Sequence, residues 1–397
     1  MTFTIKTELE TRKEVEFELA LDELDSYLNK AIEDFRGRIE IDGFRKGKAP
    51  KDLIKQKFYE ELRDVAMERL IKDSYQNLLA EKNWQPVCEA TIKDVKTEGK
   101  INFTLEIETI PQFELSQYFG LDLVKQKPRV DERMIDERLE HLREQYAKLV
   151  PTERKASIDD IVVIDYQTYD GDALIESQKG IMVEIGDRRN NEDLNRALVG
   201  MSKNETKEFL ITTDDKMVRY RIKVLAVNEK QRPLLSDEFA RELKCASLSE
   251  LKSKIKETLL REIEDTIKEE LLEKISQYLI ERNHFLVPDC LVKAEYEKML
   301  QRQNLKDSNE NWERLKKLAE DRVRLQFVLN KIANKESIKA TDEEIESMIR
   351  VQAALLQTDF EKLKEKVDDS EVRERLEGII KREKALKFIL DKANVIE

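Results

Sequence analysis

The stretch Asp42-Gly-Phe-Arg-Lys-Gly-Lys-Ala-Pro50 differs in composition from the rest of the chain, because it gathers glycines, a proline, an aromatic residue and cations. Gly43 and Gly47 permit positive φ angles and therefore a tight reversal of the backbone. Pro50 suits the first turn of a following helix. We expect a loop that presents Phe44 and the neighbouring cations to solvent, as an anionic partner would require. The alternative is an ordinary turn between two helices with solvated lysines.

A nucleotide-binding phosphate loop is excluded at this position. That motif has four residues between its first glycine and the Gly-Lys pair, and Ser or Thr follows the lysine. Here three residues separate Gly43 from Gly47, and Ala49 follows Lys48. We found no other nucleotide motif, so we expect no cofactor.

The composition predicts a helix-rich protein of several domains. Its 397 residues suggest two to three domains, and 39% of them are charged whereas only 10 are Gly and 7 are Pro. The net charge of -12 argues against general binding to nucleic acid. Residues 36–57, however, carry eight cations and three anions. This local excess favours one oriented docking site on an otherwise acidic protein.

The sequence gives no signal for metal binding, export or membrane insertion. Cys88, Cys245 and Cys290 are odd in number, far apart in the sequence and without metal-ligand spacing, which suits a reducing cytosol. His141 and His284 have no partner pattern and are expected to be surface or packing residues. The N-terminus is charged early, unlike a signal peptide, and no apolar run approaches the ~20 residues of a membrane helix. We expect a cytoplasmic protein without metal or membrane contact.

Hydrophobic periodicity predicts a compact α+β module at the N-terminus. Residues 2–20 alternate polar and apolar side chains as two strands do, and residues 22–40 change to helical spacing. Residues 51–82 are typical of one or two helices. Alternation returns over residues 92–107 and indicates two more strands. We therefore expect a module of residues 1–112 with the glycine-rich loop between its helices.

The middle of the chain predicts a linker, a helix and a β-rich insert. Residues 111–128 contain Pro111, Gly120 and Pro128, which is typical of a linker or crossing segment. Residues 130–149 have helical spacing. Short strands are then expected at residues 161–166, 181–185, 208–211 and 218–227, with a short helix at 194–199. This pattern indicates a small β-rich domain over residues 150–230.

Residues 231–397 predict long helices. They contain one glycine, Gly378, and no proline after Pro288. Residues 249–282 have an apolar stripe that predicts a helix of roughly 30 residues. Further helices are expected at 288–304, 312–334, 341–357 and 367–394, with a capping box formed by Thr341 and Glu344. Such helices cannot all surround one core, so we expect projecting arms. A coiled coil is the alternative, although no strict heptad is sustained.

Four segments resemble the trigger factor family of bacterial ribosome-associated chaperones. Residues 43–50 match the family signature Gly-Phe-Arg-x-Gly-Lys-x-Pro. Residues 232–243 resemble the return into the helical domain, residues 287–295 its Val-Pro-x-x-Leu-Val-x-x-Glu segment, and residues 332–345 a helix–turn–helix near the end. The order of the segments agrees with the family along essentially the whole chain.

The resemblance implies an α+β multidomain fold with an elongated, all-α C-terminal domain. Residues 1–112 would bind the ribosome, residues 113–149 and 231–397 would form the chaperone domain, and residues 150–230 would be a peptidyl-prolyl isomerase domain of the FK506-binding type. The implied partners are the large ribosomal subunit at the polypeptide exit, through protein and ribosomal RNA, and unfolded nascent chains. The resemblance also allows a homodimer away from the ribosome, which the sequence itself does not decide. The implied docking residues are Gly43, Phe44, Arg45, Lys46, Gly47, Lys48 and Pro50.

The resemblance also implies an isomerase pocket, of which this chain keeps little. Tyr166 and Tyr220 match two pocket aromatics. Other pocket positions hold different residues, namely Leu174, Ile175, Asn190, Asn191 and Leu194. The loop between Ile211 and Met217 is too short for the usual tyrosine-bearing flap. We expect a retained fold with weak or no isomerase activity, in which the two tyrosines could serve only sheet packing. An active isomerase and a helical scaffold without ribosome contact are the alternatives.

Overall fold

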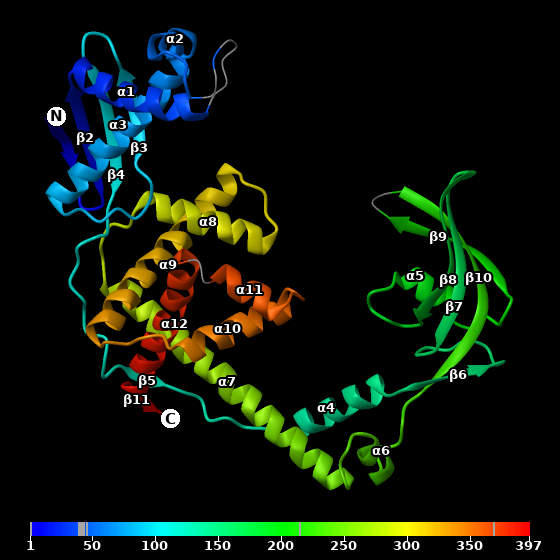
Figure 1. The fold of residues 1–397 in the computed structure, drawn as a ribbon. Helices are drawn as coiled ribbons and strands as arrows, with labels where there is room; N and C mark the ends of the chain where they lie inside the picture. Colours follow the sequence, from blue (N-terminus) through cyan, green and yellow to red (C-terminus); the bar gives the residue numbers. More distant parts are fainter. Residues whose placement is uncertain (1, 39–43, 45–46, 214–215, 368–369) are drawn as a thin grey trace. The chain divides into compact units, whose positions relative to one another are not determined.

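The computed structural model describes residues 2–38, 44, 47–213, 216–367 and 370–397 (Figure 1). Its mixture of a strand-rich insert and long C-terminal helices confirms the expected fold class. The chain forms two compact units, Met1–Lys125 with Glu269–Glu397, and Gln126–Lys268. Helix α7, Leu248–Arg282, runs from one unit into the other. The four domain ranges expected from the sequence stay a prediction.

A four-stranded antiparallel sheet forms the N-terminal module, as its alternating pattern predicted. The strands are β1 (Thr2–Glu8), β2 (Arg12–Leu19), β3 (Thr91–Lys96) and β4 (Ile101–Glu108), in the order β1-β2-β4-β3. The alternation places Val15 and Phe17 in the core. The ring of Phe17 stacks on that of Phe103 at 4.8 Å between centroids.

Three helices complete this module. They are α1 (Leu21–Arg38), α2 (Lys51–Lys57) and α3 (Tyr59–Lys82). The region from 51 to 82 is thus two helices, which meet at Phe58, whose φ of -127° and ψ of 31° are not helical. Buried Leu28, Ile32, Leu62 and Leu70 belong to the same core as the sheet.

The segment after β4 crosses to the C-terminal helices and is tied to them. Its strand β5, Asp122–Val124, pairs in parallel with β11, Asn394–Ile396, a pairing that no sequence pattern indicated. The Tyr118 hydroxyl donates a hydrogen bond to Glu336 at 2.7 Å. Burial and this contact with Glu336 raise the pKa of Tyr118 to about 12. The crossing segment therefore has an ordered place in the fold.

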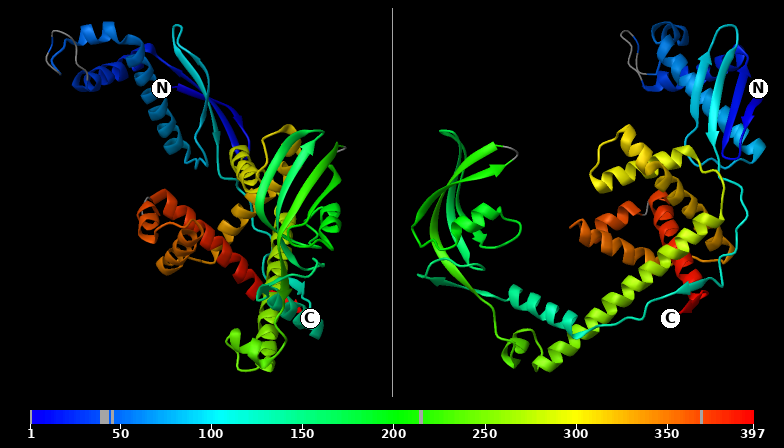
Figure 2. Two further views of the ribbon diagram at one scale, coloured as in Figure 1. Left: turned by 90° about the vertical axis from the view of Figure 1, so that its right-hand side faces the viewer. Right: turned by 180° about the vertical axis from the view of Figure 1, so that it is seen from behind.

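The C-terminal helices pack as pairs around several small cores. After α7 come α8 (Asp289–Gln303), α9 (Asn309–Lys335), α10 (Asp342–Leu355), α11 (Phe360–Val367) and α12 (Ser370–Asp391). The expected helix from 367 to 394 is thus wrong at its start, since α11 precedes it as a separate helix. The capping box of Thr341 and Glu344 is confirmed. One cluster joins α8 to α9 and another joins α10 to α11 and α12, so the helices form arms (Figure 2).

In the second unit, helix α4 (Glu132–Gln145) packs on α6 (Asp237–Glu242) and on the first part of α7. The helix expected to reach residue 149 ends earlier, because Lys148–Thr152 forms strand β6 and pairs with the end of β10. Hydrogen bonds to a distant strand therefore decide the conformation of these residues.

An antiparallel sheet forms the insert. Besides β6 it has β7 (Ile161–Asp170), β8 (Ala173–Glu184), β9 (Thr206–Thr213) and β10 (Lys216–Gln231). The order is β6-β10-β7-β8, and β9 also pairs with β10. The strands are longer than predicted. Leu198 of helix α5, Glu192–Leu198, is buried with Val162, Ile164 and Ile222 of the sheet.

An ion cluster fixes the place where the chain enters and leaves the insert. Glu144 at the end of α4 contacts both Lys230 and Arg232. Lys230 also contacts Glu184 at 2.9 Å, and Arg232 contacts Asp159 at 3.2 Å. Hydrogen bonding from Arg232, and secondly from Lys230, lowers the pKa of Glu144.

We expect Phe17→Ala to lower the free energy of unfolding of the N-terminal module by about 3–5 kcal/mol, because it leaves a cavity beside Phe103. Trp84 packs against this core and reports its unfolding in urea. All variants carry Trp312→Phe as a background, so that Trp84 is the one tryptophan left and the fluorescence reports on this module alone. The matched control is Ile92→Ala, whose side chain is exposed, with an expected change within about 0.5 kcal/mol. Equal losses for both variants would contradict the proposed core.

We expect Glu144→Gln to destabilise the second unit at neutral pH by at most about 1 kcal/mol, since the carboxylate is partly exposed. The folded pKa is lowered, so the carboxylate stabilises the fold above its unfolded pKa of about 4.3. That contribution is lost as the pH falls through the folded pKa. Scanning calorimetry from pH 7 to pH 3 should therefore show the variant and the wild type converging at low pH. A constant difference would contradict the assigned role of the charge.

Candidate functional site

The glycine-rich loop lies between α1 and α2, and part of it is described. The Phe44 side chain is 43% exposed. Gly47 has a φ of +77°, which L side chains rarely adopt, so the backbone there requires glycine. Lys48 is exposed, and Pro50 directly precedes α2. The predicted docking residues Gly43, Arg45 and Lys46 lie outside the described residues.

The C-terminal base of the loop is anchored in the module. Ala49 is 5% exposed and Ile54 is fully buried, both in the core that also holds the sheet. On the flanking helices, the rings of Phe35 and Phe58 contact each other at 5.3 Å between centroids. A rigid base of this kind presents the Phe44 ring without requiring that the module rearrange.

Not every cation near the loop is directed at solvent. Lys51 forms an ion pair with Glu33, and Arg36 lies 3.7 Å from the same carboxylate. The hydrogen bond from Lys51 lowers the pKa of Glu33. Lys55 and Lys57 are exposed, as Lys48 is. Among the described lysines near the loop, the exposed positive charge is therefore supplied by Lys48, Lys55 and Lys57, whereas Lys51 joins α2 to α1.

The structure brings Tyr166 and Tyr220 together in the insert. Their rings stack at 6.2 Å between centroids, and Phe209 stacks on Tyr220 at 5.8 Å. The three rings come from the adjacent strands β7, β10 and β9. Sequence reasoning missed Phe209, although pairing residues 206–213 with 216–223 as a hairpin would have placed it opposite Tyr220.

The Tyr166 hydroxyl is already engaged within the insert. It donates to Glu176 Oε1 at 2.9 Å. Burial, together with this contact, raises the pKa of Tyr166 to about 12. The pocket beside Tyr166 holds about 290 Å³, and Tyr220 does not line it. Most of its lining is polar or charged: Asp165, Gln167, Ser177, Gln178, Lys179, Thr206, Arg221 and Lys223. Such a lining is poorly suited to the desolvation of a peptide bond.

The substituted pocket positions have structural roles or face solvent. Leu174 and Ile175 are exposed. Asn190 Nδ2 donates to the Glu184 carbonyl at 2.7 Å, and the Asn191 side chain caps α5 by accepting from the Asp193 amide. Leu194 is half-buried against the sheet core. These contacts build a loop and a helix cap where the family resemblance implies an apolar cup.

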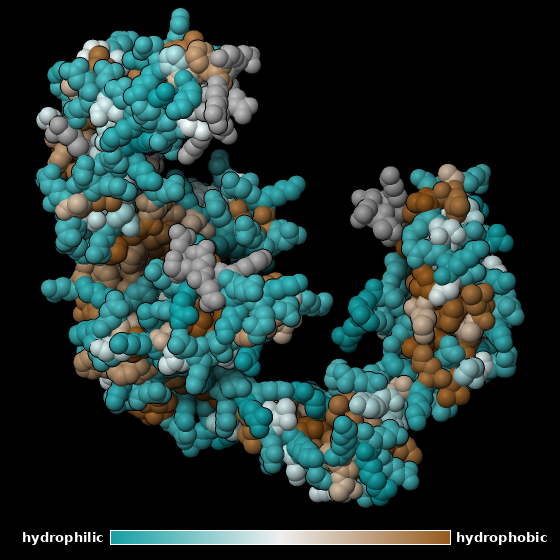
Figure 3. Space-filling view, in the orientation of Figure 1, coloured by the Kyte–Doolittle hydropathy of each residue, from teal (hydrophilic) through white to brown (hydrophobic). Residues whose placement is uncertain are grey.

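The first unit offers hollows and scattered apolar side chains rather than one pocket. A hollow of about 1180 Å³ has Ile110, Phe113 and Phe327 in its lining, together with Lys331 and Glu377. A second, of about 920 Å³, is lined mainly by charged residues of α7 and α9. Exposed apolar side chains occur singly and at the end of α10: Leu286, Leu318, Val351, Leu355 and Leu356. On the face drawn in Figure 3, apolar residues form separate patches among hydrophilic ones.

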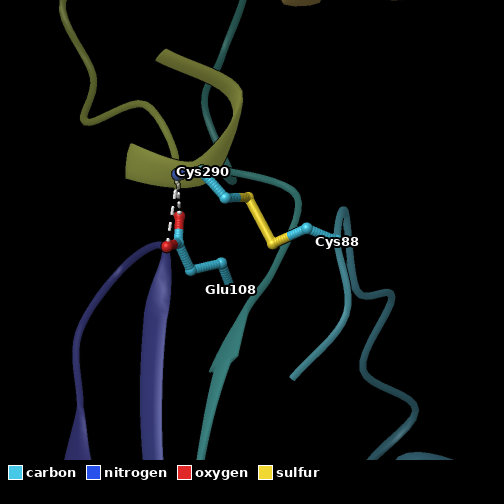
Figure 4. Close-up of a disulfide and its surroundings, with 3 residues drawn as sticks. All are labelled: Cys88, Glu108 and Cys290. Carbon is cyan, nitrogen blue, oxygen red and sulfur yellow. Dashed lines mark hydrogen bonds between the residues drawn. A yellow bond between two sulfur atoms is a disulfide. The ribbon is translucent and has the colours of Figure 1, made fainter. Parts of the chain in front are cut away.

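Two of the three cysteines meet, which their sequence separation did not indicate. Cys88 and Cys290 form a disulfide across 202 positions, beside Glu108 (Figure 4). Their sulfurs and the Glu108 carboxylate lie within 4.8 Å of one another. Cys245 is free and buried. His141 is exposed, with its ring 3.1 Å from the Gln145 side chain, in agreement with the expected surface position.

None of the helices in the described part of the chain combines the length and the apolar character needed to cross a lipid bilayer. The two long helices α7 and α9 carry charged side chains throughout, consistent with their polar surfaces.

Comparison with known proteins gives full-length matches. A family model described as bacterial trigger factor protein matches residues 1–142, and one described as its C-terminus matches residues 247–391. Trigger factor of Pelobacter propionicus is 30% identical, over 100% of this chain and 98% of that protein. Trigger factor of Caldicellulosiruptor bescii is 28% identical over the same shares.

A solved structure supports the fold. The chain studied in "Promiscuous Substrate Recognition in Folding and Assembly Activities of the Trigger Factor Chaperone" is 22% identical, with a TM-score of 0.51 over 99% of this chain and 100% of that one. The structural similarity supports the fold alone, whereas the full-length sequence matches support membership of one protein family. Taken together with the loop and the arms, they show that the chain belongs to the trigger factor family of chaperones.

Proposed function

We propose that this protein docks through residues 43–50 at the polypeptide exit of the large ribosomal subunit and holds nascent chains there without ATP. The observation that carries the proposal is the exposed ring of Phe44 beside exposed Lys48, on a loop anchored by buried Ala49. An apolar ring among cations suits a partner that has both phosphate and a small apolar recess.

The residues of the loop would make different kinds of contact with the ribosome. Arg45 can bind phosphate or carboxylate oxygens in a bidentate way, and Lys46 and Lys48 act as point charges. Because the Phe44 side chain is 43% exposed, its burial in a recess would contribute less than half of the about 1.5–3 kcal/mol that full burial of an exposed side chain supplies. The rest of the acidic chain repels ribosomal RNA, which restricts the contact to this loop.

Clients would lie against the arms of the C-terminal helices. Phe113 and Phe327 in the larger hollow, and Leu355 and Leu356 at the end of α10, offer weak apolar contacts. Many weak contacts together hold an extended chain and release it as the chain folds, so no nucleotide hydrolysis is needed. This activity belongs to the cytoplasm. Self-association away from the ribosome stays a prediction.

For the insert we propose weak or no isomerase activity. The support is that Tyr166 is bound to Glu176 and stacked on Tyr220, whereas the neighbouring pocket is polar. The second candidate function is an active isomerase that works on nascent or secreted proteins. The one observation in its favour is that Tyr166 lines that pocket.

We expect the triple variant Phe44→Ala, Arg45→Ala, Lys46→Ala to bind ribosomes at least about tenfold more weakly, since the loss of a central contact commonly exceeds 1.4 kcal/mol. Co-sedimentation with large subunits measures the affinity. The salt dependence should also become shallower, because two cations no longer displace counterions.

The matched control is the triple variant Leu174→Ala, Lys179→Ala, Arg188→Ala, which removes one exposed apolar residue and two exposed cations from the insert. It should bind ribosomes as the wild type does. Unchanged affinity of the loop variant, with its circular dichroism also unchanged, would refute docking through this loop.

We expect the protein to accelerate cis-to-trans conversion of a proline tetrapeptide little above the uncatalysed rate, whose barrier is about 18–20 kcal/mol. A protease-coupled assay measures the rate, with an intact FK506-binding-type isomerase as the positive control. A rate comparable to that control, and abolished by Tyr166→Ala, would establish the isomerase alternative instead.

A further inference from the structure

The disulfide joins two elements that the chain order separates widely. Cys88 lies between α3 and β3, and Cys290 is the second residue of α8 after the N-cap Pro288. Their Cα atoms are 6.7 Å apart, within the usual range for a disulfide. Both cysteines are only partly buried, whereas Cys245 is buried. A reagent in solution can therefore reach this pair more easily than the third cysteine.

Hydrogen bonds that do not depend on the sulfurs join α8 to the end of β4, and the end of β4 to the segment of Cys88, because the Val87 amide donates to the Glu108 carbonyl at 3.0 Å. The Glu108 carboxylate at the end of β4 accepts from the Cys290 amide at 3.0 and 3.3 Å (Figure 4). It thereby satisfies an amide in the first turn of α8, which has no partner within the helix. These hydrogen bonds do not involve the sulfurs, so reduction of the disulfide does not itself break them.

Little else joins the N-terminal module to this helix. In the described part of the chain, no strand of β1–β4 and no helix of α1–α3 packs extensively against α8–α12. The crossing segment makes its own contacts further along, where the Phe113 ring stacks on Phe285 at 4.0 Å. A covalent bond at Cys88 and Cys290 therefore adds a constraint at a place where packing supplies little.

We propose that Cys88 and Cys290 form a reversible thiol–disulfide switch, oxidised by small-molecule disulfides, that locks the N-terminal module to helix α8. This inference goes beyond the proposed function. In a cytosol rich in thiols the pair rests reduced, and a rise in oxidised small thiols closes it.

The reaction proceeds in two balanced exchanges. The thiolate of one cysteine, having released its proton, attacks a sulfur of the small disulfide, and the departing sulfur takes the electron pair and a proton as one thiol. The second cysteine, again after losing its proton, attacks the protein sulfur of this mixed disulfide and releases the second thiol. Two protein thiols are oxidised and one small disulfide is reduced. Excess thiol reverses both steps.

A divalent metal is the competing occupant of this site. Two sulfurs and the Glu108 carboxylate are three donors of the kind that zinc accepts. The structure favours the switch, because the sulfurs are bonded to each other and the carboxylate is bound to the Cys290 amide.

The experiment uses the full-length chain equilibrated with defined ratios of reduced and oxidised glutathione, then acid-quenched, alkylated and mapped by mass spectrometry. We expect a linked peptide pair containing Cys88 and Cys290 in the wild type and in Cys245→Ser, and none in Cys88→Ser or Cys290→Ser. Hydrogen exchange of residues 284–292 should slow at least tenfold on oxidation of the wild type and stay constant in Cys88→Ser.

A positioning role of Glu108 gives a second test. Glu108→Ala should shift the equilibrium at least threefold toward the reduced pair, because the thiols lose effective concentration, whereas Glu108→Gln, which keeps an acceptor, should shift it less. Three results would overturn the proposal: no linked pair at any glutathione ratio, a linked pair without a change in exchange, or a reduced protein that holds one zinc ion and resists oxidation.

Discussion

The candidate docking site depends on the burial of the C-terminal base of one loop. Ala49 and Ile54 belong to the same core as the N-terminal sheet, so the chain leaves this core at a fixed point. Gly47, at its positive φ, then turns the backbone away. Phe44 does not belong to that core, and its side chain is 43% exposed. An exposed ring on a fixed base loses little conformational entropy on binding, which makes it an effective anchor.

Much of the fold was predictable because it follows from local periodicity. Alternation in residues 2–20 and the apolar stripe of α7 each reflect one face buried against a core. The failures occur where distant residues decide the conformation. Strand β6 forms because β10 offers it a partner, and β5 pairs with β11 at the far end of the chain. No local pattern contains that information.

Some features of the candidate site could likewise be predicted from the sequence, whereas others could not. Gly47 and Pro50 could be interpreted from the sequence, since the residue type itself restricts the backbone. By contrast, the contact of Tyr166 with Glu176 depends on the β7–β8 register, which shifts nearby at bulges. The meeting of Cys88 and Cys290 depends on how a strand-rich module adjoins a helix 202 positions away. Residue identity and spacing do not determine such contacts.

The arms of the C-terminal helices explain how exposed apolar side chains persist without collapse. Ile345 and Ile349 of α10 are buried with residues of α11 and α12, which leaves a separate small core in this arm. Val351, Leu355 and Leu356 lie beyond that core on the last turns and are 58%, 78% and 69% exposed. The arm therefore presents apolar side chains from a stable base, as reversible holding of unfolded segments requires.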